Sequence, residues 1–253
     1  MKRLAQIRGL SVRYSAAFAL DHVDLDLMTG ETLAIIGESG SGKTTLAQAM
    51  GRLLPANARI SGHIDWPGFD RLPKPGCDIG FVFQDPASSF DPLMSIGAQL
   101  VETIRTHEKI DRDLARKRAT ALLERVHIPQ PQQSFARYPH QFSGGQKQRI
   151  AIALAIAAAP RLLIADEPTS ALDTIVQKQI AALLQKLVRE DGMTLLFITH
   201  DIALASGLAD RIAVFRQGRL VETGRTETVL ARPESDYTRA LIAAVPRLET
   251  AHG

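Results

Sequence analysis

Apolar and polar residues alternate along the first 36 residues in the way that short, half-buried strands require. Leu20–Leu27 alternates apolar residues (Leu20, Val23, Leu25, Leu27) with aspartates (Asp21, Asp24, Asp26), which is the pattern of a half-buried strand. Thr32–Ile36 is largely apolar and ends at Gly37, which predicts a buried strand. Further along, we predict a helix at Thr44–Leu54 and strands at Ile60–Trp66 and Asp78–Phe83.

The pattern becomes helical between Pro86 and Pro160. Ile96–Arg105 and Asp111–Val126 carry apolar residues at helical spacing, with charged residues on the opposite side. Beyond Pro160, strands are predicted at Leu162–Ala165, Thr194–Thr199 and Arg211–Arg216, and a helix at Thr174–Glu190. Strands that alternate with helices predict a parallel sheet covered on both faces, with the middle segment as an inserted helical lobe.

Composition limits the possible functions without choosing among them. The formal net charge of +3 is too small to predict binding to nucleic acid. The single cysteine, Cys77, excludes an internal disulfide and favours a reducing cytosol. The longest apolar run, Ile150–Ala159, is about half of the roughly 20 residues that a membrane-spanning helix needs. The N-terminus lacks the pattern of a secretory signal, so we expect a protein that serves any membrane from outside the bilayer.

A glycine-rich segment links the predicted strand Thr32–Ile36 to the helix after it. It consists of Gly37, Glu38, Ser39, Gly40, Ser41, Gly42, Lys43 and Thr44, and fits the P-loop pattern G-x-x-x-x-G-K-[ST]. The glycines let backbone N–H groups converge on phosphate oxygens, and the helix N-terminus adds partial positive charge. We expect Lys43 to reach the β- and γ-phosphates and the Thr44 hydroxyl to bind Mg²⁺.

Two acidic residues follow the buried strand Leu162–Ala165. The strand end places Asp166 beside the Mg²⁺ ion that Thr44 is expected to bind. Glu167 lies one residue further and is predicted to act as a general base or to orient the attacking water. Taken alone, the pair is equally consistent with solvated acids at a strand end, but the P-loop favours catalysis.

A second glycine-rich helix start lies at Ser143, Gly144, Gly145 and Gln146, ahead of a helix predicted to run to Ala159. A hydroxyl and two glycines at a helix N-terminus form a potential anion site. One nucleotide does not need two phosphate-binding loops from one chain, so we predict that this one binds the nucleotide held by another subunit. The alternative is an ordinary serine N-cap followed by flexible glycines.

With these elements, the chain resembles the nucleotide-binding subunits of ABC transporters over almost its whole length. The Ser-Gly-Gly-Gln element is the signature of that family. The resemblance implies an α/β P-loop NTPase (RecA-like) core with an N-terminal antiparallel β region, at residues 1–85 and 161–230. It also implies an inserted α-helical subdomain at 86–160 and a tail at 231–253. Two subunits would sandwich two ATP molecules, with Gly37–Thr45, including Thr45, of one chain facing Ser143–Gln146 of the other.

The resemblance assigns further residues one by one. Gln84 matches the loop glutamine that meets Mg²⁺ and water and senses the membrane subunit, and His200 matches the switch histidine at the γ-phosphate. Together with Glu167 they form the expected catalytic set. Tyr14 falls where the family places an aromatic ring against adenine, although Phe18 is an alternative. The loop that joins the two sites of the dimer matches Ser170, Ala171, Leu172 and Asp173.

Two segments resemble the oligopeptide, dipeptide and nickel importers within the family. They are the extended run Gln84–Pro92 and the tail motifs at Ala231–Pro233, Tyr237–Leu241 and Val245–Pro246. Ser235-Asp236 replaces the usual His-Pro before the tyrosine, and the chain ends without the cysteine-containing extension of many peptide importers.

The importer resemblance also implies a set of partners. These are a second ATPase subunit, either a sister chain or an identical copy, two membrane permeases and a solute-binding protein. No nucleic acid is expected, and the location would be peripheral, on the cytoplasmic face of the inner or plasma membrane. The rival is a soluble ABC ATPase outside transport, such as an accessory subunit of phosphonate breakdown. A DNA-repair ATPase would need a long coiled-coil insertion, which the sequence lacks.

Overall fold

The computed structural model describes residues 2–15, 17–170 and 172–244. A three-stranded antiparallel sheet, in the order β2-β1-β4, contains β1 (Arg3–Tyr14), β2 (Ala17–Met28) and β4 (Ala58–Asp65). The prediction of short strands was wrong here, because β1 and β2 each extend over 12 residues and pair as one long hairpin. Positive φ angles at Gly9 and His22 accompany irregularities in their register.

The second sheet has six strands in the order β5-β6-β7-β3-β8-β9. The strands are β3 (Thr32–Ile36), β5 (Ile79–Val82), β6 (Leu162–Asp166), β7 (Thr194–Ile198), β8 (Arg211–Arg216) and β9 (Arg219–Arg225). Five of them are parallel, as predicted, whereas β9 pairs antiparallel with β8. The prediction missed β9, which follows a tight turn at Gln217 and Gly218, both with positive φ.

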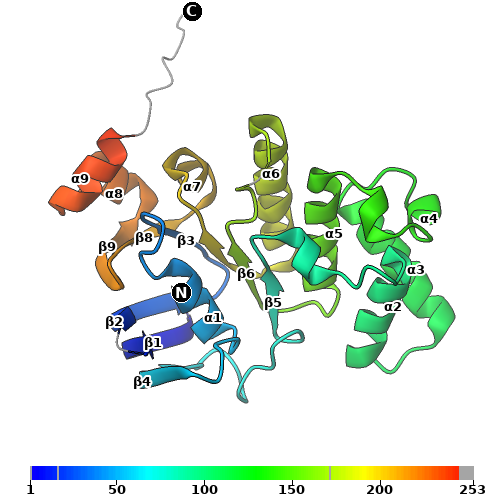
Figure 1. The fold of residues 1–253 in the computed structure, drawn as a ribbon, viewed down its shortest axis with the longest axis horizontal. Helices are drawn as coiled ribbons and strands as arrows, with labels where there is room; N and C mark the ends of the chain where they lie inside the picture. Colours follow the sequence, from blue (N-terminus) through cyan, green and yellow to red (C-terminus); the bar gives the residue numbers. More distant parts are fainter. Residues whose placement is uncertain (1, 16, 171, 245–253) are drawn as a thin grey trace, which may run out of the picture.

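Helices cover both faces of this sheet (Figure 1). They are α1 (Lys43–Met50), α2 (Ile96–His107), α3 (Arg112–Arg125), α4 (Pro131–Ser134), α5 (Gly144–Ile156), α6 (Thr174–Asp191), α7 (Ile202–Leu208), α8 (Thr226–Ala231) and α9 (Asp236–Ala243). Short 3₁₀ turns lie at Pro86–Ser89 and Pro139–Gln141. Two helices end earlier than predicted, α1 at Met50 and α5 at Ile156, and positive φ angles follow at Arg52 and Ala159.

Alternate side chains of β6 pack against different helices, which shows on which face of the sheet each helix lies. Leu162 and Ile164 share a hydrophobic cluster with Leu46 of α1 and with the antiparallel sheet. Leu163 and Ala165 belong instead to the cluster that contains helices α2, α3, α5 and α6. The phosphate-loop helix α1 and the helix α5 therefore lie on opposite sides of the parallel sheet.

The helices α2–α5 come between β5 and β6 in the chain and share their hydrophobic cluster with the sheet. The C-terminal helices α8 and α9 lie beside β8 and β9, at the other end of the molecule from α2 and α3 (Figure 1). Within residues 2–15, 17–170 and 172–244, no helix is both long and apolar enough to cross a membrane.

Candidate functional site

The predicted site residues follow four adjacent strands at the carboxyl edge of the parallel sheet. In the order β5, β6, β7, β3, the strands lead to Gln84, Glu167, His200 and the glycine-rich loop. Carboxyl ends of parallel strands meet at one edge, and open α/β sheets bind ligands there. The fold therefore gathers residues that lie up to 163 positions apart.

At two positions of the loop only glycine fits, because a side chain would collide with neighbouring backbone. Gly37 has φ +151, and a Cβ atom on it would lie 2.2 Å from the carbonyl oxygen of Phe215. Gly42 has φ +101, and its Cβ would lie 2.5 Å from the carbonyl oxygen of Ala19. Because neighbouring backbone occupies the space of both side chains, the loop holds its conformation against β2 and β8.

Lys43 is buried and bonded to the loop itself. Its Nζ donates to the carbonyl oxygens of Gly37 and Glu38, each at 2.8 Å. Burial lowers the pKa of Lys43, and the nearby carboxylates of Glu167 and Asp166 partly oppose this effect. An ammonium group has three donors, so one of the three is left for a further acceptor.

Asp166 is the last residue of β6 and is buried. The Thr44 hydroxyl donates to its Oδ1 at 3.2 Å. Burial raises the pKa of Asp166, and the neighbouring Glu167 carboxylate raises it further, whereas Thr44 and Lys43 lower it. A buried carboxylate with a hydroxyl at its side is a set of oxygen donors suited to Mg²⁺.

Glu167 joins two of the other predicted residues. Gln84 Nε2 donates to Glu167 Oε2 at 3.2 Å, and His200 Nδ1 lies 3.4 Å from the same oxygen. The backbone of Glu167 has φ +44, an uncommon conformation for a residue with a side chain. Its amide donates to the carbonyl of Ile198 at the end of β7, which fixes the carboxylate between the two strand ends.

The two aromatic candidates differ in their environment. Tyr14 ends β1 and packs against the hydrophobic cluster of the antiparallel sheet. Phe18 is 44% exposed, and the guanidinium of Arg13 lies 3.6 Å from the centre of its ring. Both positions lie at the hairpin end of the antiparallel sheet, where Tyr14 pairs with Ala17 and Arg13 with Phe18.

The Ser143–Gln146 segment starts α5 as a capping box. The Ser143 hydroxyl accepts from the Gln146 amide at 3.3 Å, and the Gln146 side chain accepts from the Ser143 amide at 3.1 Å. Gly145 has a packing reason that the sequence did not reveal, because its Cβ would lie 2.8 Å from Val176 of α6. Ser143 is therefore the N-cap of α5, and the anion site predicted from the sequence would lie at this same helix N-terminus.

The segment 170–173 leads from the acids into α6. Ser170 donates its amide to the Glu167 carbonyl, and Asp173 caps α6 by accepting from the amides of Ile175 and Val176. Ala171, which the sequence included in this loop, lies outside the described residues.

Sequence reasoning missed one contact of the phosphate loop. The Glu38 amide donates to the hydroxyl of Tyr237 on α9 at 3.3 Å. The two residues are 199 positions apart, and no local pattern links them.

The loop and the acids fit a nucleotide phosphate with Mg²⁺. The Ser41 hydroxyl is buried without a hydrogen-bond partner among the described residues, and Gly42 begins α1 without a side-chain cap. These free donors, the third donor of Lys43 and the Thr44–Asp166 pair together match the chemistry of a magnesium–phosphate group.

Comparison with known proteins places this site in a family. The family model described as ABC transporter matches residues 20–170. The chain is 44% identical to the peptidoglycan transport ATP-binding protein YejF of Agrobacterium fabrum and 42% identical to the oligopeptide transport ATP-binding protein OppD of Bacillus subtilis. Each alignment covers 98% of this chain, but 48% of YejF and 73% of OppD.

A solved structure supports the same assignment. The ATP-binding cassette MJ0796, a dimer bound to ADP and phosphate, matches with a TM-score of 0.76 and 30% identity, over 88% of this chain and 98% of that chain. The chain belongs to the ABC transporter family, and its architecture is the P-loop α/β fold of the family's ATPase cassettes.

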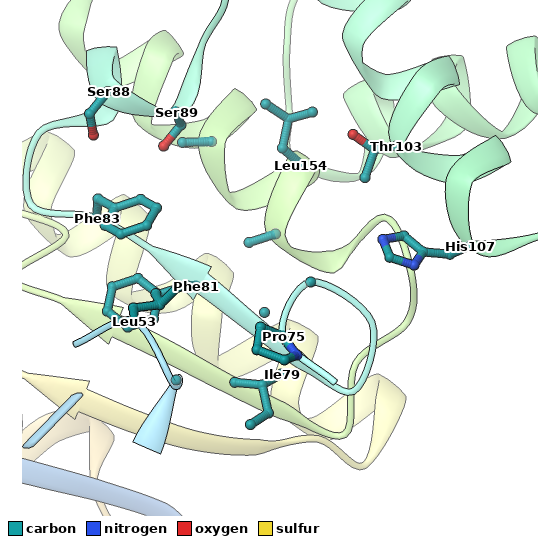
Figure 2. A pocket seen from close by; sticks show the side chains of 15 residues that line it. Leu53, Pro75, Ile79, Phe81, Phe83, Ser88, Ser89, Thr103, His107 and Leu154 are labelled. Atoms are coloured by element: carbon teal, nitrogen blue, oxygen red, sulfur yellow. The ribbon is translucent and has the colours of Figure 1, made fainter. Parts of the chain in front are cut away.

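A separate cavity of about 370 Å³ lies between the edge strand β5 and the helices α2 and α5. Figure 2 shows Phe81 and Phe83 from β5 and its end on one side, and Leu154 and Thr103 on the other. Phe83 is the residue before Gln84, so the cavity and the carboxyl edge of the parallel sheet are joined through one strand end.

Proposed function

We propose that this chain is the ATP-hydrolysing subunit of an importer, which energises uptake of a peptide-type substrate through separate membrane permeases. The observation that carries the ATPase assignment is the position of Glu167. Its carboxylate meets Gln84 and His200, while the adjacent Asp166 meets Thr44 of the phosphate loop. A base, its orienting groups and a metal-binding acid thus lie at one strand end.

The residues of the loop divide the binding of ATP among them. Backbone amides of the Gly37–Thr45 loop other than that of Glu38, the Ser41 hydroxyl and Lys43 bind the phosphates, and Thr44, Asp166 and Gln84 hold Mg²⁺. Bound Mg²⁺ supplies charge neutralisation at the phosphates. Tyr14 stacks on adenine, with Phe18 as the alternative because its ring is the more exposed.

Glu167 accepts the proton of the attacking water. Gln84 and His200 hold its carboxylate from two sides, which limits the orientations that the base can adopt.

Dimerisation completes the site. Helices α1 and α5 lie on opposite faces of the sheet, which supports a role for Ser143–Gln146 on the nucleotide of a second subunit. Residues 170–173 would join the two sites, and the partner is a sister chain or an identical copy. The dimeric state of MJ0796 supports this arrangement.

The cavity beside β5 is the proposed docking place for a permease helix. Its aromatic wall includes Phe81 and Phe83 (Figure 2). Phe83 precedes Gln84 in the chain, which connects the partner to the hydrolytic residues. The segment 86–160 would move as a subdomain against the core, 1–85 and 161–230, with residues 231–244 at the far side. The chain then sits peripherally on the cytoplasmic face of the inner or plasma membrane.

The relatives favour a peptide-type substrate, delivered by a solute-binding protein, because their names specify transport of oligopeptides and of peptidoglycan. They give no specific support to nickel, nor to the soluble accessory ATPase considered from sequence.

The ATPase proposal is tested with Glu167→Gln. We expect Mg-ATP binding to persist, turnover to fall by about 100-fold or more, and closed dimers to accumulate, since a general base contributes about 10²–10⁴ in rate. Glu190→Gln serves as the charge-matched control, because Glu190 lies on α6 in a solvent-exposed ion pair with Arg125. Wild-type turnover in Glu167→Gln would refute the role of Glu167.

The partner proposal is tested with Phe83→Asp in the cells from which this protein derives, so that its own membrane partners are present. We expect loss of co-purification with the membrane fraction, while Ile60→Asp, an equally apolar exposed site on β4, retains it. If both variants are recovered equally in the membrane fraction, the cavity is not part of the interface with the permease.

A further inference from the structure

The phosphate loop is bonded to the C-terminal helix α9 at a single point. The backbone N–H of Glu38 donates to the Tyr237 hydroxyl at 3.3 Å. This contact joins the first turn of the loop after β3 to the first turn of α9. The P-loop pattern does not require it, because the contacting atom of the loop is a backbone amide.

The bonded amide belongs to the peptide group that holds Lys43. The Gly37 carbonyl and the Glu38 N–H are the two ends of one planar peptide. Lys43 Nζ donates to that carbonyl at 2.8 Å, while the Tyr237 hydroxyl accepts from the N–H. Hydrogen bonds in such a chain polarise one another, so the tyrosine both orients the peptide and strengthens its acceptor end.

Three contacts hold the Tyr237 ring in place. The guanidinium of Arg216, at the end of β8, lies 4.8 Å from the ring centre. The ring packs with Leu241 against the cluster that contains Ile36, the last residue of β3. The Ser235 hydroxyl caps α9 by accepting from the Tyr237 amide at 3.2 Å.

A carboxylate on β9 fixes the start of the same helix. Glu222 accepts from the amides of Glu234 and Ser235 at 2.9 and 3.1 Å. Burial on its own raises the pKa of Glu222, but the Thr238 hydroxyl and the two amides outweigh burial and hold this pKa below its ordinary value. The position of Tyr237 is therefore set by contacts with residues at the ends of β3 and β8 and by the anchoring of the helix start to β9.

We infer that Tyr237 is a positioning residue for Lys43, and that α9 thereby sets the nucleotide affinity of the phosphate loop. The inference rests on the proposed ATPase function. Tyr237 fixes the Gly37–Glu38 peptide, the peptide fixes two of the three donors of Lys43, and the third donor is left aimed at the phosphate. Tyr237 acts through the loop peptide and not through Glu167, Gln84 or His200, so we expect its effect on binding and not on the chemical step.

The test is Tyr237→Phe, which keeps the ring and its packing but removes the hydroxyl. We expect the Kd for Mg-ATP and the KM to rise about two- to tenfold, the effect of one hydrogen bond, with kcat changed less than about twofold. Asp236→Asn is the matched control, because that side chain is 97% exposed on the same helix turn, and its Kd should stay at the wild-type value.

A double-mutant cycle separates positioning from packing. In a Lys43→Ala background, Tyr237→Phe should change the Kd for Mg-ATP by less than about 1.5-fold, because the group through which it acts is gone. An unchanged Kd in Tyr237→Phe, or an equal rise in both backgrounds, overturns the inference. If Lys43→Ala itself binds Mg-ATP like the wild type, the proposed function fails instead, so the two failures are distinguishable.

Discussion

Two helices of this protein begin with glycines, yet their first turns differ. Helix α1 starts at Gly42 without a side-chain cap, and the buried Ser41 hydroxyl beside it has no partner among the described residues. Helix α5 starts at Ser143 with a complete capping box. Neither first turn contains an acidic residue, so the helix dipole is uncompensated in both.

The start of α1 has hydrogen-bonding groups without partners in the described residues, whereas those of Ser143 and Gln146 at the start of α5 bond to each other. The donors at α1 are held in place by Gly37, Gly42 and the bonds of Lys43, so a phosphate can bind without rearrangement. At α5, the Ser143 hydroxyl already accepts a hydrogen bond, but its own proton is free to donate to an anion from a second subunit.

The largest difference is expected when the lysine near the start of each helix is replaced by alanine. Lys43→Ala should weaken binding of Mg-ATP by about 30-fold or more, because a buried charged group that pairs with phosphate is lost. Lys147→Ala, in the first turns of α5, should leave this affinity unchanged. Equilibrium binding to the isolated chain checks both, and equal losses would refute the asymmetry.

Replacing one glycine at each helix start by alanine should change the stability of the protein by different amounts, because the two backbone conformations differ. Gly42→Ala is expected to destabilise the fold by about 3 kcal/mol, because φ is +101 and the Cβ meets the Ala19 carbonyl. Gly144→Ala places its Cβ 3.7 Å from Leu172 and should keep or raise stability by up to about 1 kcal/mol. Urea unfolding measures both, and similar costs would contradict the comparison.

Ser143→Ala tests whether the cap has a second use. The loss of the cap should cost about 1 kcal/mol, and Ser95→Ala at the cap of α2 should cost the same. Only Ser143→Ala should also impair ATP-dependent dimerisation, measured by light scattering with Glu167→Gln in the background. If the two cap variants dimerise alike, α5 has no role at the second nucleotide.

The smallest effect concerns the link from the phosphate loop to α9. The pKa of Glu222 is below its ordinary value, so its carboxylate stabilises the fold above about pH 4.5, and this contribution is lost as pH falls through the lowered pKa. Glu222→Gln should therefore be less stable than wild type at pH 7, with the difference shrinking below pH 4.5. Glu227→Gln, at an exposed position of α8, is the control, and a difference that is independent of pH would contradict the assignment.

Much of the fold followed from short-range pattern. The bounds of β3 and β8 match the prediction, because a run of apolar residues between turn signals defines a buried strand. The strands β6 and β7 differ from it by one residue at one end, and β5 by one residue at each end. The strand β9 and the helices α8 and α9 were missed, because they have only 7, 6 and 8 residues and each therefore offers few positions in which a period can be recognised. The division into core, helical segment and tail stays a prediction.

The sequence by itself determined which chemical groups this protein has and in what order: the phosphate loop, the acids after β6 and the capped start of α5. Those features depend on neighbours a few positions away. Only the tertiary structure decided that Gln84 and His200 meet at Glu167, that α1 and α5 take opposite faces, and that Tyr237 reaches Glu38. Strand order and packing set such contacts, and no local spacing encodes them.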